Sequence, residues 1–181
     1  MIRITGGEHR SRLLITPSTN LTKPTMDKVR AAVFSALGDA VKNAKVLDLF
    51  AGSGSYGFEA ISRGAESATF VDLSSEAISA IKKNADSLKA QNVDIVKGDV
   101  LDYLEQNSQE FSIIFVDPPY KLDVYQTIVE KVLNNHILGE NGILVLESER
   151  ELNIDESKFK SVRFYKYGLA KVYILRKWIW R

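Results

Sequence analysis

The sequence predicts a doubly wound α/β domain built on a mostly parallel sheet. From Lys45 onward, five short apolar runs alternate with amphipathic segments. This alternation is typical of a parallel sheet with helices on both faces, joined by right-handed crossovers. After Glu151 the alternation stops, and two consecutive runs with no helix between them predict an antiparallel hairpin. We therefore expect a seven-stranded sheet with one antiparallel strand.

Short elements precede this sheet. The runs IRIT and RLLIT flank Gly6 and Gly7 and suggest a small β-hairpin, and residues 25–42 carry apolar side chains at helical spacing. The length of 181 residues fits one domain with a sizeable core. We divide that single domain into a hairpin extension, a leading helix and a cofactor-binding catalytic core, at residues 1–24, 25–44 and 45–181.

Each core element has its own signal. The five expected strands are rich in β-branched or aromatic residues and end in polar or glycine turns; they are AKVLDLF, SATFVDL, NVDIVKG, SIIFVDPP and NGILVLES. The clearest helix follows Ser74, a good N-cap residue, and runs through SSEAISAIKKNADSLKA. The final hairpin pairs KSVRFYKYG with LAKVYILRKW, and Gly168 lies near its turn.

Composition excludes several classes of protein. The chain has no cysteine, which rules out disulfides, thiolate metal sites and cysteine nucleophiles and suits a reducing compartment. His9 and His136 lie far apart without metal-ligand spacing, so we expect no metal. No signal-peptide core and no run of eighteen apolar residues is present, so we expect a cytoplasmic protein.

The net charge of +1 conceals a strong asymmetry along the chain. Residues 1–30 carry six Lys and Arg side chains against two acidic ones, and residues 158–181 carry eight against none, whereas the middle of the chain is acidic. The basic ends are either solvated surface or a phosphate-binding face.

A glycine loop follows the first core strand. In DLFAGSGSYG, Gly52, Gly54 and Gly57 match G-x-G-x-x-G between a predicted strand and a predicted helix, the context that gives this motif meaning. Asp72 ends the next strand, where a carboxylate accepts hydrogen bonds from ribose hydroxyls. The alternative is a tight turn beside a surface aspartate. We infer a nucleoside-containing cofactor.

The chemistry of nearby acids favours one cofactor. Asp48 lies inside the first core strand, where its charge would repel the pyrophosphate of a nicotinamide dinucleotide and attract an ammonium or sulfonium group. S-adenosylmethionine carries both cationic groups. Asp99 ends the third strand and either reaches an adenine amino group or caps a helix. The expected cofactor contacts are Asp48, Phe50, Ala51, Gly52, Ser53, Gly54, Asp72, Leu73, Asp99 and Val100.

The stretch DPPY closes the fourth core strand. Proline donates no ladder hydrogen bond, so Asp117, Pro118, Pro119 and Tyr120 must lie in a stiff loop at the strand end, where ligands of such sheets bind. An exocyclic amine has two N–H donors, which the Asp117 carboxylate and the Pro118 carbonyl would accept while Tyr120 stacks on the base. The alternative is a rigid loop with a structural tyrosine.

These motifs resemble those of class I S-adenosylmethionine-dependent methyltransferases, a Rossmann-like fold. The stretches IRITGGEHRSRLL, KPTMDKVRAAVFSAL, FSIIFVDPPY and KYGLAKVYILRK narrow the resemblance to the RsmD-type rRNA guanine-N2 methyltransferases, over essentially the whole length. The resemblance implies bacterial 16S rRNA as substrate, within the 30S particle. Guanine rather than adenine rests on this resemblance alone. We expect a monomer.

Alternatives to this function are a DNA adenine-N6 methyltransferase, a nicotinamide-dependent oxidoreductase and a non-catalytic RNA-binding assembly factor. The candidate RNA contacts are Arg10, Arg12, Lys23, Thr25, Lys28 and Arg30. The alternative for each of them is a solvated surface residue without a role in binding. Trp178 and Trp180 either stack on RNA or cover a sheet edge, and we favour packing.

Overall fold

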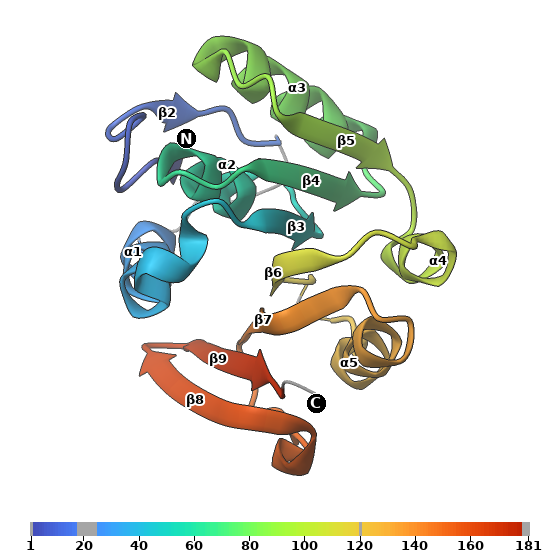
Figure 1. Cartoon of the computed structure of the whole chain (residues 1–181). Helices are drawn as coiled ribbons and strands as arrows, with labels where there is room; N and C mark the ends of the chain where they lie inside the picture. The colour runs from blue at the N-terminus through green and yellow to red at the C-terminus, as the bar shows by residue number, and fades with distance from the viewer. Residues whose placement is uncertain (1, 18–24, 120, 179–181) are drawn as a thin grey trace.

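The computed structural model describes residues 2–17, 25–119 and 121–178. These residues form the expected seven-stranded sheet and a separate two-stranded hairpin (Figure 1). In chain order the sheet strands are β3 (Lys45–Leu49), β4 (Ser67–Asp72), β5 (Val93–Lys97), β6 (Phe111–Val116), β7 (Leu138–Ser148), β8 (Phe159–Tyr167) and β9 (Ala170–Lys177). Across the sheet their order is β5-β4-β3-β6-β7-β9-β8.

The strand order reverses between β3 and β6. Strands β3, β4, β5, β6 and β7 pair in parallel, whereas β9 pairs antiparallel with both β7 and β8, so β9 is the reversed strand that the sequence predicts. From β3 the chain builds outward to β5 and then returns to place β6 on the other side of β3. The carboxyl ends of β3 and β6 therefore flank the switch point at which such sheets bind ligands.

Helices cover both faces of the sheet (Figure 1). The helices are α1 (Thr25–Leu37), α2 (Ser55–Ser62), α3 (Ser75–Leu88), α4 (Val100–Gln106) and α5 (Tyr125–Asn134), with 3₁₀ turns η1 (Gly38–Val41) and η2 (Glu156–Lys158). The first helix was predicted to reach Lys42, but its α-helical part ends at Leu37, because Gly38 has a φ of 56°. Within the described residues, no helix has the length and apolar character needed to span a membrane.

The sheet separates two apolar clusters. On one face, Phe70 and Phe115 pack under α1, α2 and α3; on the other, Leu49 and Leu144 pack under α4 and α5. Strands β3, β6 and β7 supply alternate residues to the two clusters, as expected for a sheet that is covered on both sides. This alternation decides which face receives the polar residues at the strand ends.

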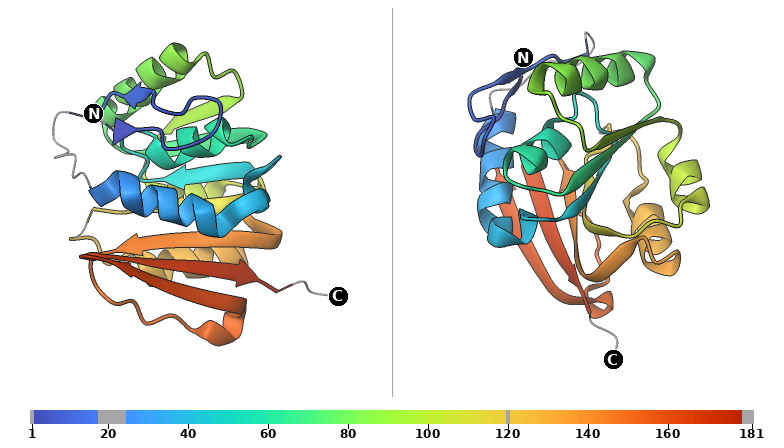
Figure 2. Two further views of the ribbon diagram at one scale, coloured as in Figure 1. Left: turned by 90° about the vertical axis from the view of Figure 1, so that its left-hand side faces the viewer. Right: turned by 45° about the horizontal axis from the view of Figure 1, so that its top comes forward.

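The N-terminal extension joins the first of these clusters. Its hairpin pairs β1 (Ile2–Arg3) with β2 (Leu13–Leu14), shorter strands than the sequence suggested. The side chains of Ile2, Ile4 and Leu14 are buried in the cluster under α1 and α2. Both views in Figure 2 show the hairpin on this side of the sheet, near α1 and α2.

Candidate active site

The glycine loop between β3 and α2 is a compact turn. Its residues Phe50, Gly52 and Gly54 have φ angles of 58°, 57° and 77°, a region that glycine adopts without strain. Gly57 lies in the first turn of α2, where an added Cβ would come within 2.2 Å of the Phe70 ring. The third glycine of the motif therefore lets α2 pack closely on β4, and the first two shape the turn.

Asp72 fastens this loop to the end of β4. Its Oδ2 accepts a hydrogen bond from the Gly52 amide at 2.9 Å, and its Oδ1 accepts one from the Ser74 amide at 2.8 Å. The residue is partly exposed, and a carboxylate offers about four lone-pair sites. Asp72 thus orders the loop and keeps acceptor sites for ligand hydroxyls.

Asp48 lies directly beneath the loop. Its side chain is 2% exposed, and its Oδ2 accepts a hydrogen bond from the Gly57 amide at 2.9 Å. Burial raises the pKa of Asp48 to about 8. The hydrogen bond from Gly57 and the positive charge of Arg30 oppose this rise, whereas the negative charge of Asp72 adds to it. A cationic ligand next to Asp48 would lower that pKa again.

The other expected cofactor contacts divide into exposed and buried groups. Leu73 is 66% exposed just after Asp72, whereas Val100 is buried in the cluster under α4. Asp99 caps α4, because its Oδ1 accepts hydrogen bonds from the Leu101 and Asp102 amides at 2.8 and 3.2 Å. The capping alternative for Asp99 is therefore present, and its contact with adenine stays a prediction.

Asp117 follows β6 at the switch point. Val116 pairs with Leu49 of β3 and with Leu146 of β7, so the next residue lies between the ends of these strands. Asp117 is half-buried and accepts no hydrogen bond from the described residues. Burial raises the pKa of Asp117 well above its ordinary value, and the charges of Glu147 and Asp48 raise it further.

The rest of the DPPY loop is only partly described. Pro118 is buried, and Pro119 is exposed with its carbonyl accepting a hydrogen bond from the Leu122 amide at 2.9 Å. The Pro118 carbonyl accepts none from the described residues. Tyr120, the expected stacking ring, lies outside the described residues.

Sequence reasoning missed Glu147, which follows Leu146 and is the last residue but one of β7. Phe115 and Val145 belong to the cluster under α1 and α2, and alternation along the strands turns Asp117 and Glu147 toward that same face. Val46 of β3 also belongs to this cluster, which gives Asp48 the same orientation. A signal was available, since Glu147 follows an apolar run as Asp117 does. Asp48, Asp117 and Glu147 thus lie on one face of the sheet, near the carboxyl ends of three adjacent strands.

The expected RNA contacts differ in exposure. Arg10, Arg12 and Lys28 are exposed, although the Arg12 guanidinium also donates to the Ser87 carbonyl at 2.8 Å. Thr25 begins α1, and Lys23 and Trp180 lie outside the described residues. The exposed ring of Trp178 is 46% accessible, which is poor support for the packing role we favoured.

Arg30 corrects the sequence analysis. The expectation of a phosphate contact is wrong, because the side chain is 2% exposed. Its guanidinium pairs with Asp27 at 2.8 Å and with the fully buried Glu59 at 3.3 Å, and it donates to the Arg3 carbonyl. A charge this far from solvent needs such partners. The basic composition of the N-terminal segment gave no indication that this arginine points inward.

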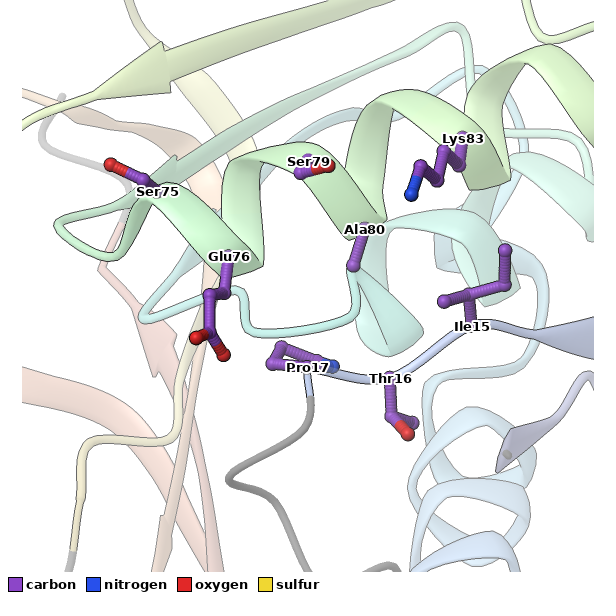
Figure 3. A pocket seen from close by; sticks show the side chains of 8 residues that line it. All are labelled: Ile15, Thr16, Pro17, Ser75, Glu76, Ser79, Ala80 and Lys83. Carbon is purple, nitrogen blue, oxygen red and sulfur yellow. The ribbon is translucent and has the colours of Figure 1, made fainter.

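A second residue missed by sequence reasoning connects the extension to the glycine loop. The buried Asn84 of α3 exchanges hydrogen bonds with the backbone of Ile15, at 2.8 and 2.9 Å, and donates to the Ser53 carbonyl at 2.9 Å. One amide therefore fixes both segments. A pocket of about 350 Å³ opens beside it, between Ile15–Pro17 and the first half of α3 (Figure 3). Asp117 and Glu147 do not line this pocket.

The described residues contain no cluster of three His, Cys, Asp or Glu side chains with the geometry of a metal site. Carboxylates accept hydrogen bonds, so the acids at these strand ends suit an organic ligand that carries N–H or O–H donors. The site combines a partly exposed carboxyl group at the end of β4, a buried carboxyl group under the glycine loop, and acceptors without donors from the described residues at the switch point.

Known proteins are similar to this chain in sequence and fold. A family model described as conserved hypothetical protein 95 matches residues 2–176. Ribosomal RNA small subunit methyltransferase D of Escherichia coli (strain K12) is 35% identical over 150 residues, which cover 83% of this chain and 76% of the relative. The solved structure of Escherichia coli yhhF has a TM-score of 0.89 at 31% identity and covers 99% of both chains.

A further solved structure includes ligands. It is the Thermus thermophilus 16S rRNA N2 G1207 methyltransferase (RsmC) in complex with AdoMet and guanosine, with a TM-score of 0.71 at 25% identity. It covers 90% of this chain and 45% of that one. Together, the family match and the identity to the Escherichia coli methyltransferase confirm the resemblance drawn from the motifs. The chain belongs to the family described as conserved hypothetical protein 95, the RsmD-type class I methyltransferases.

Proposed function

We propose that this protein transfers a methyl group from S-adenosylmethionine to the exocyclic N2 amine of a guanine in bacterial 16S rRNA. The observation that carries the proposal is Asp117, a carboxylate without hydrogen-bond donors from the described residues, placed at the switch point beside the glycine loop. The relatives add the substrate class, since one acts on small-subunit rRNA and another was solved with AdoMet and guanosine.

The residues around the glycine loop fit the cofactor. Asp72 offers acceptors to the two ribose hydroxyls, and Asp48 places a negative charge under the loop where a methionine ammonium or a sulfonium would lie. When bound, S-adenosylmethionine supplies a methyl group on a positively charged sulfur, which leaves as a neutral thioether. S-adenosylmethionine has no pyrophosphate and carries two positively charged groups, so it matches the negative charge of Asp48 better than a nicotinamide dinucleotide does.

The DPPY loop performs the positioning. The Asp117 carboxylate and the Pro118 carbonyl accept the two N–H donors of the amine and so orient its nitrogen lone pair. Alignment of this kind contributes up to about 7–11 kcal/mol to a transfer reaction. Asp117 then stabilises the positive charge that develops on nitrogen, and the acidified N–H proton passes to its carboxylate and on to solvent. The raised pKa of Asp117 suits a proton acceptor.

The whole chain serves as one methyltransferase domain in this proposal, acting as a monomer in the cytoplasm without a metal. Arg10, Arg12 and Lys28 supply exposed positive charge near the extension for rRNA phosphates. In this proposal the 30S particle itself presents the target nucleotide.

Labelled S-adenosylmethionine tests the proposal when it is incubated separately with naked rRNA, 30S particles and duplex DNA, followed by nucleoside analysis. We expect N2-methylguanosine from particles. N6-methyladenosine from DNA would instead make the protein a DNA methyltransferase. Tight particle binding without transfer to any substrate would make it a non-catalytic assembly factor.

A further inference from the structure

Glu147 has no role in the function proposed so far, yet it lies next to Asp117. The pairing of Val116 with Leu146 puts the two acids at neighbouring positions of parallel strands, which lie about 4.8 Å apart in such sheets. Both point to the face covered by α1 and α2. A ligand held by Asp117 therefore meets Glu147 on the side facing β7, away from the glycine loop, because the strand order is β4-β3-β6-β7.

The Glu147 side chain is held in place from one side only. Its Oε2 accepts a hydrogen bond from the Tyr56 hydroxyl at 2.5 Å. Tyr56 is buried and stacks on Phe115 with ring centroids 4.7 Å apart, so the donor has little freedom. The backbone is also fixed, because the Tyr125 hydroxyl donates to the Glu147 carbonyl at 2.7 Å. Oε1 accepts no hydrogen bond from the described residues.

The position of Glu147 carries an electrostatic cost. Its charge raises the pKa of the neighbouring Asp117, and burial raises the pKa of Glu147 itself, opposed by the Tyr56 hydrogen bond and by Arg30. A purely structural clamp between α2 and β7 needs one acceptor for Tyr56, which a glutamine would provide without a negative charge beside Asp117. The second oxygen of the Glu147 carboxylate, Oε1, suits a ligand that carries a further hydrogen-bond donor.

We propose that Glu147 is a specificity-determining residue that accepts a hydrogen bond from N1–H of the target guanine. This inference rests on the proposed function and gives the choice of guanine a physical basis. The guanine edge presents N1–H directly beside its N2 amine, so two adjacent carboxylates match two adjacent donor groups. Adenine presents an unprotonated N1 beside its amine. A carboxylate facing that lone pair would repel it, and adenine would be rejected.

A base analogue, which lacks both N1–H and O6, tests this contact without changing the protein, and the Glu147→Gln variant then separates the N1 contribution from that of O6. Once the labelled nucleotide of the wild-type reaction is mapped, 30S particles are assembled from ligated rRNA with 2-aminopurine at that position. The analogue retains the 2-amino group but has an acceptor at N1. We expect the wild-type kcat/KM for guanine to exceed that for 2-aminopurine by roughly 10–100-fold. Equal rates on the two bases would overturn the inference.

Glu147→Gln supplies the complementary change. Its amide oxygen can keep the hydrogen bond from Tyr56, which turns the NH₂ group toward the base. We expect the guanine rate to fall about 10–100-fold and the 2-aminopurine rate to rise relative to it, because the amide donates to the analogue's N1. The matched control is Glu140→Gln, an exposed residue at the other end of β7, which should leave the guanine preference unchanged.

Two readouts separate the possible failures. The melting temperature should stay close to that of wild type and the calorimetric Kd for S-adenosylmethionine should stay within twofold, since Glu147→Gln keeps an acceptor for the Tyr56 hydroxyl. An equal loss of activity on both bases would assign Glu147 a structural role and overturn the inference. If the wild-type protein produces no N2-methylguanosine, the proposed function fails, a result distinct from either outcome with the variant.

Discussion

The two halves of the site use the same chemical group in opposite ways. On the proposed cofactor side, the carboxyl groups of Asp72 and Asp48 already accept hydrogen bonds from the amides of Gly52, Ser74 and Gly57. On the substrate side, Asp117 accepts none from the described residues, and Glu147 accepts one through Oε2, from Tyr56. Acidic residues near the ends of neighbouring strands can therefore either order a loop or remain available to a ligand. The number of hydrogen bonds that each carboxyl group already accepts distinguishes the two roles.

The charge of Arg30 lowers the pKa of a carboxyl group in each half, Asp48 and Glu147. Its removal should have the largest effect on stability. Arg30→Met removes a buried cation that pairs with Glu59 and Asp27 and leaves Arg63 as the remaining partner of Glu59, at a cost of about 3–5 kcal/mol. In a chain of this length that corresponds to a fall in Tm of roughly 10 °C by differential scanning calorimetry. Lys28→Met on the exposed face of the same helix is the control and should melt within a degree or two of wild type. Equal stability of the two variants would contradict the buried role of Arg30.

Asp117→Ala should impair methyl transfer without impairing cofactor binding. Loss of the acceptor that stabilises positive charge on the amine should lower kcat about 10²–10³-fold. The Kd for S-adenosylmethionine, measured by calorimetry, should change little, because the glycine loop is fastened by Asp72 and not by Asp117. Asp94→Ala, at an exposed position on β5, serves as the control. If cofactor binding disappeared with Asp117, the division of the site into two halves would be wrong.

Asp72→Ala should weaken cofactor binding. Loss of acceptors for the two ribose hydroxyls, each worth about 1.5–3 kcal/mol when the acceptor is charged, should raise the Kd for S-adenosylmethionine about 10²–10⁴-fold. The amides of Gly52 and Ser74 also lose their acceptor, so protection of the loop against hydrogen exchange should fall. With the cofactor saturating, kcat should stay within a few-fold of wild type. A large loss of kcat at saturation would mean that Asp72 also acts on the methyl-transfer step.

Asp48→Asn should produce a change that is visible as a pH dependence of stability. The folded-state pKa of about 8 lies above the ordinary 3.8, so the folded protein binds this proton more tightly than the unfolded chain. Wild-type stability is therefore lost as the pH rises from about 4 toward 8, and the variant avoids that loss. We expect its Tm advantage to grow between pH 5 and 8, reaching about 2–4 °C for each 1 kcal/mol gained.

The same substitution should weaken cofactor binding, because a neutral side chain no longer attracts a cationic ligand. Asp94→Asn is the control for both measurements, since its side chain is exposed. A Tm difference that stays constant with pH would show that Asp48 is ionised in the folded protein over this whole range.

Local sequence patterns accounted for much of the fold and for half of the site. The apolar runs predicted the sheet strands because strands buried on both faces leave continuous hydrophobic stretches. The glycine loop and Asp72 were predictable because their spacing reflects a single strand–turn–helix–strand unit. The first helix was predicted too long, because a glycine inside an amphipathic pattern ends the α-helix only when it adopts a positive φ.

Burial and side-chain partnership were beyond the reach of sequence patterns. Arg30 belongs to a basic segment and was expected at the surface, yet Glu59, twenty-nine residues later, draws it inward. Asn84 gave no signal at all, since its role depends on two segments that meet only when α3 packs against the extension. Such contacts join residues distant along the chain, and no short motif encodes them.

The sequence by itself determined the order and type of the strands, the glycine loop, and the position of Asp117 at a strand end, since each follows from periodicity or from backbone limits on glycine and proline. Only the tertiary structure decided that Glu147 stands beside Asp117 and that Arg30 is the buried counter-charge. Those facts depend on strand order and side-chain facing, which arise when the chain folds back on itself and segments far apart in sequence share one low-dielectric interior.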